Sequence, residues 1–404
     1  MSSVPHFPPP PPLPASSVKV AFSGDRGDFR RLVTRGAMLE LVTFGFYRFW
    51  LATDIRRHLW SHTSIDGDAP EYTGRARELL IGFLFALAIL VPIYLAYFLI
   101  GIEAERAKAF ASLPLFLFFY LFGHFAIYRA RRYRLTRTVW RGVRFWMDGS
   151  GWAYAAWAAG WSLLTMLTLG LALPWRQAAL ERYKMRHCHY GDLQGSFEGR
   201  GWEFFKRGWW LWLLAVVPLT LLLVVMVRNW PAQIKIPPYV ALPVLLLAPF
   251  LYGAFKAIEW RWWISGIRFG EVSFESDLSK SALYGLYWKV IGWSLPLLIL
   301  LMVYIYLCST LLVQMGLAPF AVFSTNGKFS GSVAMLVLGG AGYLAFLLAM
   351  TVVVRVYLLR DVWARAAAST TVFRLEAAAN VAAKGELVSA LGEGLADGLD
   401  IVGF

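Results

Sequence analysis

Long apolar runs alternate with short basic segments along most of this 404-residue chain. Several windows of about 18 or more residues carry no charge, which is the length needed to cross roughly 30 Å of bilayer hydrocarbon. A soluble core does not hide five or six such runs. The six apolar runs cover residues 79–101, 113–128, 209–227, 239–257, 284–312 and 332–354. We therefore predict an all-α fold, a polytopic α-helical membrane protein with six transmembrane helices.

Two further apolar segments, 36–52 and 153–175, are harder to place because basic residues flank both of their ends. The second lies between the arginine-rich segments 129–144 and 176–207. A full crossing would put one basic set on the outer side, against the positive-inside rule. The interpretation we favour is that both segments enter and return on one side, breaking at a Thr-x-Gly where glycine weakens the helix. Two additional transmembrane segments are the alternative.

The stretch from Thr43 to Glu78 recurs 125 positions later without a gap. The repeated motif consists of Thr43, Gly45, Trp50 and Gly74 in the first copy and of Thr168, Gly170, Pro174, Trp175 and Gly199 in the second. A degenerate third copy has Leu295-Pro296-Leu297 in place of the Thr-x-Gly. This spacing predicts a duplicated module of ~125 residues, which is typical of membrane proteins with internal repeats.

The repeats and the composition divide the chain into five parts. We expect a disordered, proline-rich cytoplasmic tail at 1–19, because consecutive prolines favour an extended, solvated chain. Membrane modules follow at 20–144, 145–268 and 269–360, the last being the degenerate copy. A cytoplasmic helical tail is expected at 361–404, where alanine is abundant and the end is acidic.

Composition strengthens the membrane interpretation. Apolar residues make up 58% of the chain, charged residues only 16%, and the mean hydropathy is +0.54. The net charge of +14 does not point to nucleic acid, because the basic residues lie mostly between apolar runs. There the positive-inside rule places them in the cytoplasm together with both termini. The abundant tryptophans, such as Trp202, Trp209, Trp260 and Trp263, are expected to form an interfacial belt.

The arginines around the repeat are candidate contacts for phosphate or anionic lipid head groups, because planar guanidinium groups match phosphate oxygens. The set consists of Arg56, Arg57, Arg75, Arg182, Arg186 and Arg200. Setting membrane topology is the alternative role of these residues.

The sequence gives little evidence for a metal site or a catalytic site. His58 and His62 are four apart, with His187 and His189 at the matching place in the second copy, but no carboxylate pair completes a metal site. No phosphate loop, nucleophile elbow or zinc-protease motif occurs in the sequence. We therefore expect no catalytic residues, no metal and no cofactor, and a protein that is not an enzyme. Glu40 is the one acidic residue within a partial insertion.

The string Thr-Leu-Gly-x-x-x-Pro-Trp at 168–175, the basic run after it, Phe197-x-Gly199 and the terminal Gly-Glu-x-Leu-Ala-Asp-x-Leu-Asp resemble the YjgN/DUF898 family. Its members are bacterial inner-membrane proteins of unknown function. The resemblance implies a multi-pass location in the cell inner membrane and a membrane-associated metallopeptidase as a partner. It supplies no catalytic residues.

These features favour a non-enzymatic scaffold or partner of another membrane protein, bound to anionic membrane lipids. The alternative is a transporter or channel for a small or lipid-like anionic solute, with the two broken segments as its gate. A transporter would need a cavity where the two Thr-x-Gly breaks approach each other.

Overall fold

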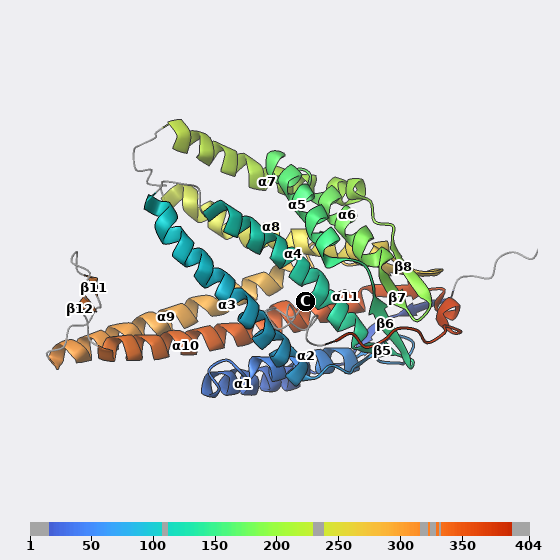
Figure 1. Ribbon diagram of the computed structural model, residues 1–404, viewed down its shortest axis with the longest axis horizontal. Coiled ribbons are helices and arrows are strands. Elements are labelled where there is room, and N and C mark those ends of the chain that lie inside the picture. Colours follow the sequence, from blue (N-terminus) through green and yellow to red (C-terminus); the bar gives the residue numbers. More distant parts are fainter. Residues whose placement is uncertain are drawn as a thin grey trace, which may run out of the picture.

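The protein is described by a computed structural model that covers residues 16–106, 112–228, 238–315, 322–323, 329–330 and 333–389. The main strands gather at one end of the molecule, and the long helices extend away from that end (Figure 1). The chain runs through five successive units, each ordered strand, helix, helix, strand. The architecture is therefore a ring of five related units.

The elements of the units follow in chain order. Unit 1 comprises β1 (Ser17–Lys19), β2 (Ala21–Phe22), α1 (Arg26–Val42), α2 (Arg48–Ser61) and β3 (Thr63–Ser64). Unit 2 comprises β4 (Glu71–Tyr72), α3 (Ala76–Arg106), α4 (Ser112–Thr136) and β5 (Thr138–Trp140). Unit 3 comprises β6 (Val143–Met147), α5 (Gly151–Leu167), α6 (Leu173–Arg186) and β7 (Cys188–Tyr190). Unit 4 comprises β8 (Leu193–Phe197), α7 (Gly201–Arg228), α8 (Pro238–Gly266) and β9 (Ile267–Phe269). Unit 5 comprises β10 (Val272–Ser276), α9 (Tyr284–Gln314), α10 (Val333–Val354), the π-helix η1 (Arg355–Arg360), α11 (Asp361–Ala368) and β13 (Thr370–Phe373). The short pair β11 (Val322–Phe323) and β12 (Phe329–Ser330) lies between α9 and α10, and the 3₁₀-helix η2 (Leu375–Ala378) follows β13.

The strands of the five units close into a barrel. Within each unit the first strand pairs antiparallel with the last, and each last strand pairs with the first strand of the next unit. A bridge between Ile65 and Asp68 makes the link from β3 to β4. β13 then pairs with β1, where Val18 lies opposite Val372, and β1 continues into β2 through Val20. Closure at β3 and β4 thus depends on one bridge, and the sheet edges left there are only two residues long.

One backbone hydrogen bond repeats in all five units, just where the helices leave the barrel. The residue after each first strand donates its N–H to the carbonyl before the last strand. The five bonds are Ser23 to His62 at 2.9 Å, Thr73 to Arg137 at 2.8 Å, Asp148 to His187 at 3.0 Å, Glu198 to Gly266 at 2.9 Å and Asp277 to Ser369 at 3.0 Å. This common geometry aligns the five units position by position.

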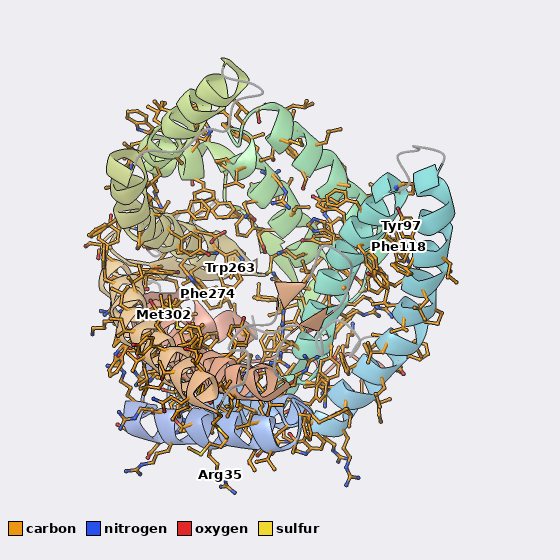
Figure 2. All side chains as sticks on the ribbon, turned by 90° about the vertical axis from the view of Figure 1, so that its left-hand side faces the viewer. Arg35, Tyr97, Phe118, Trp263, Phe274 and Met302 are labelled. Atoms are coloured by element: carbon orange, nitrogen blue, oxygen red, sulfur yellow. The ribbon has the colours of Figure 1, made fainter. Side chains whose placement is uncertain are left out.

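The helices form a second ring above the barrel. Figure 2 looks down on it from the helical end, with Trp263 and Phe274 near the centre and Arg35 projecting outward from α1. Successive helices contact each other in chain order, and α10 contacts α1. The hairpins α1–α2 and α5–α6 are short, whereas the helices of units 2, 4 and 5 run up to 31 residues. Each unit thus projects one helical hairpin from the same end of the barrel.

Side chains fill the barrel interior. Trp140, Tyr190, Val272 and Val372 are buried in one apolar cluster, together with Leu375 of η2 beyond the last strand. The chain after η2 runs along the barrel, where Ala382 N–H donates to Asp192 at 3.1 Å and Arg137 donates to the carbonyl of Val388 at 3.1 Å. The acidic end of the expected tail, 392–404, lies outside the described residues.

The all-α prediction is wrong, because nine strands form one antiparallel sheet and β2 with β3 extends it. The sequence did not reveal these strands because they are two to five residues long, and within each unit a whole helical hairpin separates the two paired strands. Strand β1 also falls within the 1–19 tail that was expected to be disordered, and β13 within the C-terminal tail that was expected to be helical.

The prediction of six transmembrane helices is also wrong. Among the described residues, three helices are long and apolar enough to cross a membrane: Ala76–Leu99, Tyr284–Gln314 and Val337–Ala368. The apolar run 113–128 is short, and arginines follow it in the same helix. Parts of 209–227 and 239–257 lie outside the residues whose side chains are described.

The segments 36–52 and 153–175 fold back as the hairpins α1–α2 and α5–α6, and neither is among the three candidate spans. In unit 5, by contrast, α9 continues through Pro296, where the third Thr-x-Gly was missing. The five units subdivide the modules proposed from sequence, whose boundaries at 20–144, 145–268 and 269–360 remain a prediction.

Candidate functional site

A cavity of ≈ 400 Å³ lies where the helices meet the barrel, and all five units contribute to its wall. We call it the axial chamber. Its lining residues are Trp60 of α2, Arg131, Arg134 and Leu135 of α4, Thr138 of β5, Gln177 and Glu181 of α6, Lys256, Glu259, Trp260, Trp262 and Trp263 of α8, and Trp363 of α11. Trp263 appears near the centre of the ring in Figure 2.

One position of the units supplies the core of this wall. Arg131, Glu181, Trp260 and Trp363 each stand seven residues before the first residue of the strand that follows their helix. Because the junction hydrogen bond fixes the same register in every unit, these side chains come to one height above the barrel. In unit 1 the same position is Arg56, which is buried and donates to the hydroxyl of Tyr72 at 3.2 Å.

A buried ion pair crosses the boundary between units 2 and 3. Arg131 Nη1 lies 3.1 Å from Glu181 Oε2, and Lys184 donates a second hydrogen bond to the same carboxylate. Burial alone would raise the pKa of Glu181, but Lys184 and Arg131 outweigh it and hold the pKa at about 2. Burial lowers the pKa of Lys184, whereas the pKa of Arg131 is raised. Arg131 is therefore the more strongly protonated of the two partners of Glu181. Glu181 is therefore an anion at neutral pH.

A second ion pair lies within unit 4, and a hydrogen bond links it to unit 3. Lys256 Nζ lies 2.7 Å from Glu259 Oε2, three residues on in α8. Gln177 of α6 donates to the other oxygen of Glu259 at 3.4 Å. The chamber thus carries three cationic and two carboxylate side chains, each carboxylate with a cation beside it, which leaves a formal excess of one positive charge.

Indole rings supply most of the remaining wall. Trp60 and Trp363 stack with centroids 5.3 Å apart at 15°. Their ring nitrogens donate to Thr138 at 3.1 Å and to Thr63 at 2.8 Å, respectively, so both rings are held in place. Trp260 meets Trp263 edge-on at 5.5 Å. Aromatic faces with a few converging charges are the usual composition of a pocket for an organic ligand.

The composition of the chamber wall suits an organic ligand. Across the described part of the chain, no three His, Cys, Asp or Glu side chains gather in a metal-binding group. Beneath the chamber the barrel is filled by side chains. A ligand with an apolar or aromatic body and one anionic group would match the walls and the excess positive charge.

Comparison with known proteins places the chain in a family. The model of a family described as bacterial protein of unknown function (DUF898) matches residues 17–235, which span units 1 to 3 and α7. The chain belongs to the DUF898 family. No curated protein matches it, and no solved structure does either. Family membership therefore agrees with the resemblance seen in sequence and assigns no activity.

In this DUF898 chain the predicted arginine set divides in two. Arg56 is buried, and Arg57 Nη2 donates to the carbonyl of Gly74 at 2.9 Å, so both hold the structure together. The exposed members of the set are Arg75, Arg182, Arg186 and Arg200. They lie near the junction of helices and barrel, directly before α3 and α7 or in the last turns of α6. Only these four are placed to meet a head group.

The repeated Thr-x-Gly forms the same turn in both short hairpins. Thr43 Oγ1 donates to the carbonyl of Leu39 at 2.7 Å and accepts from the N–H of Tyr47 at 2.9 Å. Thr168 makes the same two bonds, at 2.8 Å and 3.1 Å. Gly45 and Gly170 both have φ +87°, which favours glycine. The two turns lie at the tips of different hairpins, and neither lines the axial chamber.

The other repeated residues have structural positions. Pro174 occupies the first turn of α6, where its missing N–H costs no hydrogen bond. Trp175 packs against Phe205 with centroids 5.5 Å apart, and Trp50 stacks on Tyr47 at 6.3 Å. At Gly74 and Gly199 an added Cβ would lie 2.6 Å from the aromatic ring two residues earlier. The motif therefore marks two places, the turn at the tip of the short hairpins and, at Gly74 and Gly199, the exit from a barrel strand.

The histidine clusters remain separate. The rings of His58 and His62 lie 4.2 Å apart, and His187 Nδ1 lies 2.7 Å from Asp148. His189 stacks on Trp146 at 4.0 Å. Between the last two, burial raises the pKa of the Cys188 thiol to about 11, which keeps it protonated at neutral pH. Glu40 pairs with Arg355 at 3.2 Å.

Sequence reasoning missed the axial chamber. Trp260 and Trp263 were assigned to a lipid-facing belt, and Arg131 to a topological signal. The available signal was the spacing of Trp260 and Arg131, each seven residues before the β-strand that follows, a position repeated in five units. It could be found only after the strands had been recognised.

Proposed function

We propose that the protein is a multi-pass inner-membrane protein that binds a small or lipid-like anionic molecule in the axial chamber without converting it chemically. The chamber carries this proposal, because it is the one cavity to which all five units contribute among the pockets of the described residues. Its excess positive charge and indole walls favour an amphiphile with an anionic group. Passage through the barrel is not part of the proposal.

Membrane placement is supported by the surface of the long helices. Large apolar side chains such as Phe85, Leu99, Ile299 and Leu307 are exposed along α3 and α9. Exposed apolar area of this extent is unusual for a soluble protein and typical of a lipid-facing surface. The four exposed arginines at the base of the helices are proposed to contact anionic head groups.

The orientation follows from the same charge distribution. The barrel and the basic junction would lie on the cytoplasmic side, by the positive-inside rule. Both described ends of the chain, near Ser16 and Leu387, lie with the barrel, which supports cytoplasmic termini. The metallopeptidase partner implied by the family resemblance remains a proposal without a dedicated surface.

The test is identification of what the chamber retains. Protein purified in mild detergent would be analysed for bound small molecules by mass spectrometry, beside the variant Leu135→Trp, which fills the chamber. The matched control is Leu163→Trp on the exposed face of α5. We expect a defined anionic compound with the wild type and the control but not with Leu135→Trp.

The same experiment can also favour the competing function, a scaffold for another membrane protein. If Leu135→Trp retains the same compounds as the wild type, or none is found, the chamber is not the site. A defined membrane protein recovered in constant ratio would then favour the scaffold role expected from sequence.

A further inference from the structure

Units 2 and 4 are equivalent position by position, yet they differ at one place that matters for ligand binding. In unit 2 the side chain of Arg137 reaches back to the start of α3, where its Nε lies 2.9 Å from Glu78 Oε2. Tyr133 donates to the same oxygen at 2.9 Å. The guanidinium is largely buried, so the space beside the helix start is filled and the carboxylate is paired.

In unit 4 the position of Arg137 is Gly266, which accepts the equivalent junction hydrogen bond. The carboxylate is still there as Glu203, whose N–H bonds to the carbonyl of Arg200 as that of Glu78 bonds to Arg75. Without the arginine side chain a cleft of ≈ 700 Å³ remains beside the start of α7. An added Cβ at Gly266 would lie 2.5 Å from the Phe197 ring, so no side chain can return there without displacing it.

Three arginines line the cleft. Arg200 lies directly before α7 and matches Arg75 of unit 2, Arg207 lies in α7, and Arg268 lies on β9. At the equivalent places of Arg207 and Arg268, unit 2 has Gly82 and Val139. Arg268 is committed to the wall, because its Nε lies 3.1 Å from Glu198 and its Nη1 donates to the carbonyl of Ser265 at 2.9 Å.

The other three charged residues of the cleft indicate what kind of ligand it would bind. Within the described part of the chain, the side chains of Arg200, Arg207 and Glu203 make no ion pair or hydrogen bond with another residue. Two guanidinium groups suit a phosphodiester, and one carboxylate suits an ammonium group. A ligand that carries both charges close together would satisfy all three side chains.

The surroundings indicate where such a ligand comes from. Trp202 and Trp209 are about half exposed on the same helix, at the level where indole rings mark a membrane interface. Leu213, Leu214 and Val217 follow as exposed apolar residues further along α7. Acyl chains of a lipid seated in the cleft would lie along this apolar stretch.

We propose that the cleft beside Arg200, Glu203 and Arg207 binds the head group of a zwitterionic glycerophospholipid with a phosphodiester and a primary ammonium. The arginines hold the phosphodiester, and Glu203 takes the position of acceptor that Glu78 fills for Arg137 in unit 2. This site is separate from the axial chamber, because none of these three residues lines it.

Lipid retention tests the proposal. The full chain would be reconstituted with equal amounts of ethanolamine, glycerol and choline phospholipids, extracted in mild detergent, and analysed by native mass spectrometry. We expect the wild type to prefer the ethanolamine lipid over the glycerol lipid by about tenfold, the worth of one charge-assisted hydrogen bond. Glu203→Gln should abolish that preference, and Arg200→Gln with Arg207→Gln should lower retention of all three lipids.

The matched control is Arg75→Gln, which removes the equivalent of Arg200 where Arg137 fills the space. It should leave the preference for ethanolamine lipid intact. Equal preference in the wild type and Glu203→Gln would overturn the proposal. Soluble glycerophosphoethanolamine separates the two sources of the head group. If it displaces the lipid at equal concentration, a free solute and not a lipid is the ligand, which also overturns it.

Discussion

Arg131 and Glu181 occupy the same position in two consecutive units, and their side chains meet at 3.1 Å above the barrel. Each stands seven residues before the strand that follows its helix. The pair thus links α4 to α6 across a unit boundary, inside the wall of the axial chamber. A contact that joins units at the chamber makes the cavity and the stability of the ring depend on the same side chains.

Removing one side chain of the Arg131–Glu181 pair should therefore lower the stability of the protein strongly. Glu181→Gln leaves Arg131 and Lys184 buried without a carboxylate, and we expect the unfolding free energy to fall by about 3–5 kcal/mol. Thermal and denaturant unfolding in detergent would measure the change. The control is Arg31→Gln, which breaks an exposed pair with Asp28 at 3.4 Å and should change stability by less than about 1 kcal/mol. Equal effects of the two variants would contradict this role of Glu181.

The same carboxylate predicts a pH dependence. The pKa of Glu181 falls from 4.5 to about 2 on folding, because Lys184 and Arg131 outweigh its burial. A depressed pKa contributes stability that is complete above the unfolded value and is lost as pH falls through the folded value. We expect the wild type to lose about 3 kcal/mol between roughly pH 5 and pH 2 through this group. Subtracting the pH profile of Glu181→Gln isolates that loss, and identical slopes for both proteins would refute it.

Two glycines of unit 3 should respond to alanine with opposite signs. Gly170 has φ +87° in the hairpin turn, where an alanine side chain costs about 1–2 kcal/mol. Gly160 lies inside α5 with nothing within 4 Å of an added Cβ, so alanine there should stabilise the helix by about 0.5–1 kcal/mol. Melting temperatures of the two variants, measured in the same detergent, test the turn geometry. A stabilising Gly170→Ala would show that the turn differs.

The sequence predicted those turns well and the barrel not at all. A Thr-x-Gly within an apolar run has a local physical consequence, since the glycine can adopt the positive φ that ends a helix and the threonine hydroxyl can bond to the backbone of the turn. Strands such as Glu71–Tyr72 have no local signature, because two residues show no alternation and their partners are more than 60 positions away. Asp66-Gly67 and Arg141-Gly142 form two of the turns between neighbouring strands, and all four residues have positive φ, but only Asp-Gly is a dipeptide typical of such turns.

The axial chamber could not be predicted from the sequence for a related reason. Composition alone does not distinguish a tryptophan that faces lipid from one that faces the axis of a ring. Trp202 is exposed on α7, whereas Trp262 is buried and stacks on Phe204 at 4.8 Å. Only the register set by the barrel decides between the two orientations. The basic residue Arg131 likewise serves a buried pair, although its neighbours in sequence obey the charge rule of membrane topology.

Closure of the barrel gives the most direct test of the architecture, because it joins residues from the two ends of the described chain. Val18 of β1 lies opposite Val372 of β13, and both side chains belong to the apolar cluster inside the barrel. Opposite residues in an antiparallel pair have Cα atoms about 4.5–5.5 Å apart, within reach of a disulfide. We expect Val18→Cys with Val372→Cys to form an intramolecular disulfide on mild oxidation, detected by peptide mass spectrometry and faster mobility without reductant.

Cys188 and Cys308 are buried and remain in place. The matched control pairs Val18→Cys with Val139→Cys on β5, a strand that is not a neighbour of β1 in the barrel, and it should stay reduced. Because the new bond closes a loop of several hundred residues, it should raise the unfolding free energy by about 4 kcal/mol where the native geometry accepts it. Efficient bonding in the control, or none in the Val18 and Val372 pair, would mean that the strands do not close. The five units would then lack the common register on which the chamber and the head-group cleft both depend.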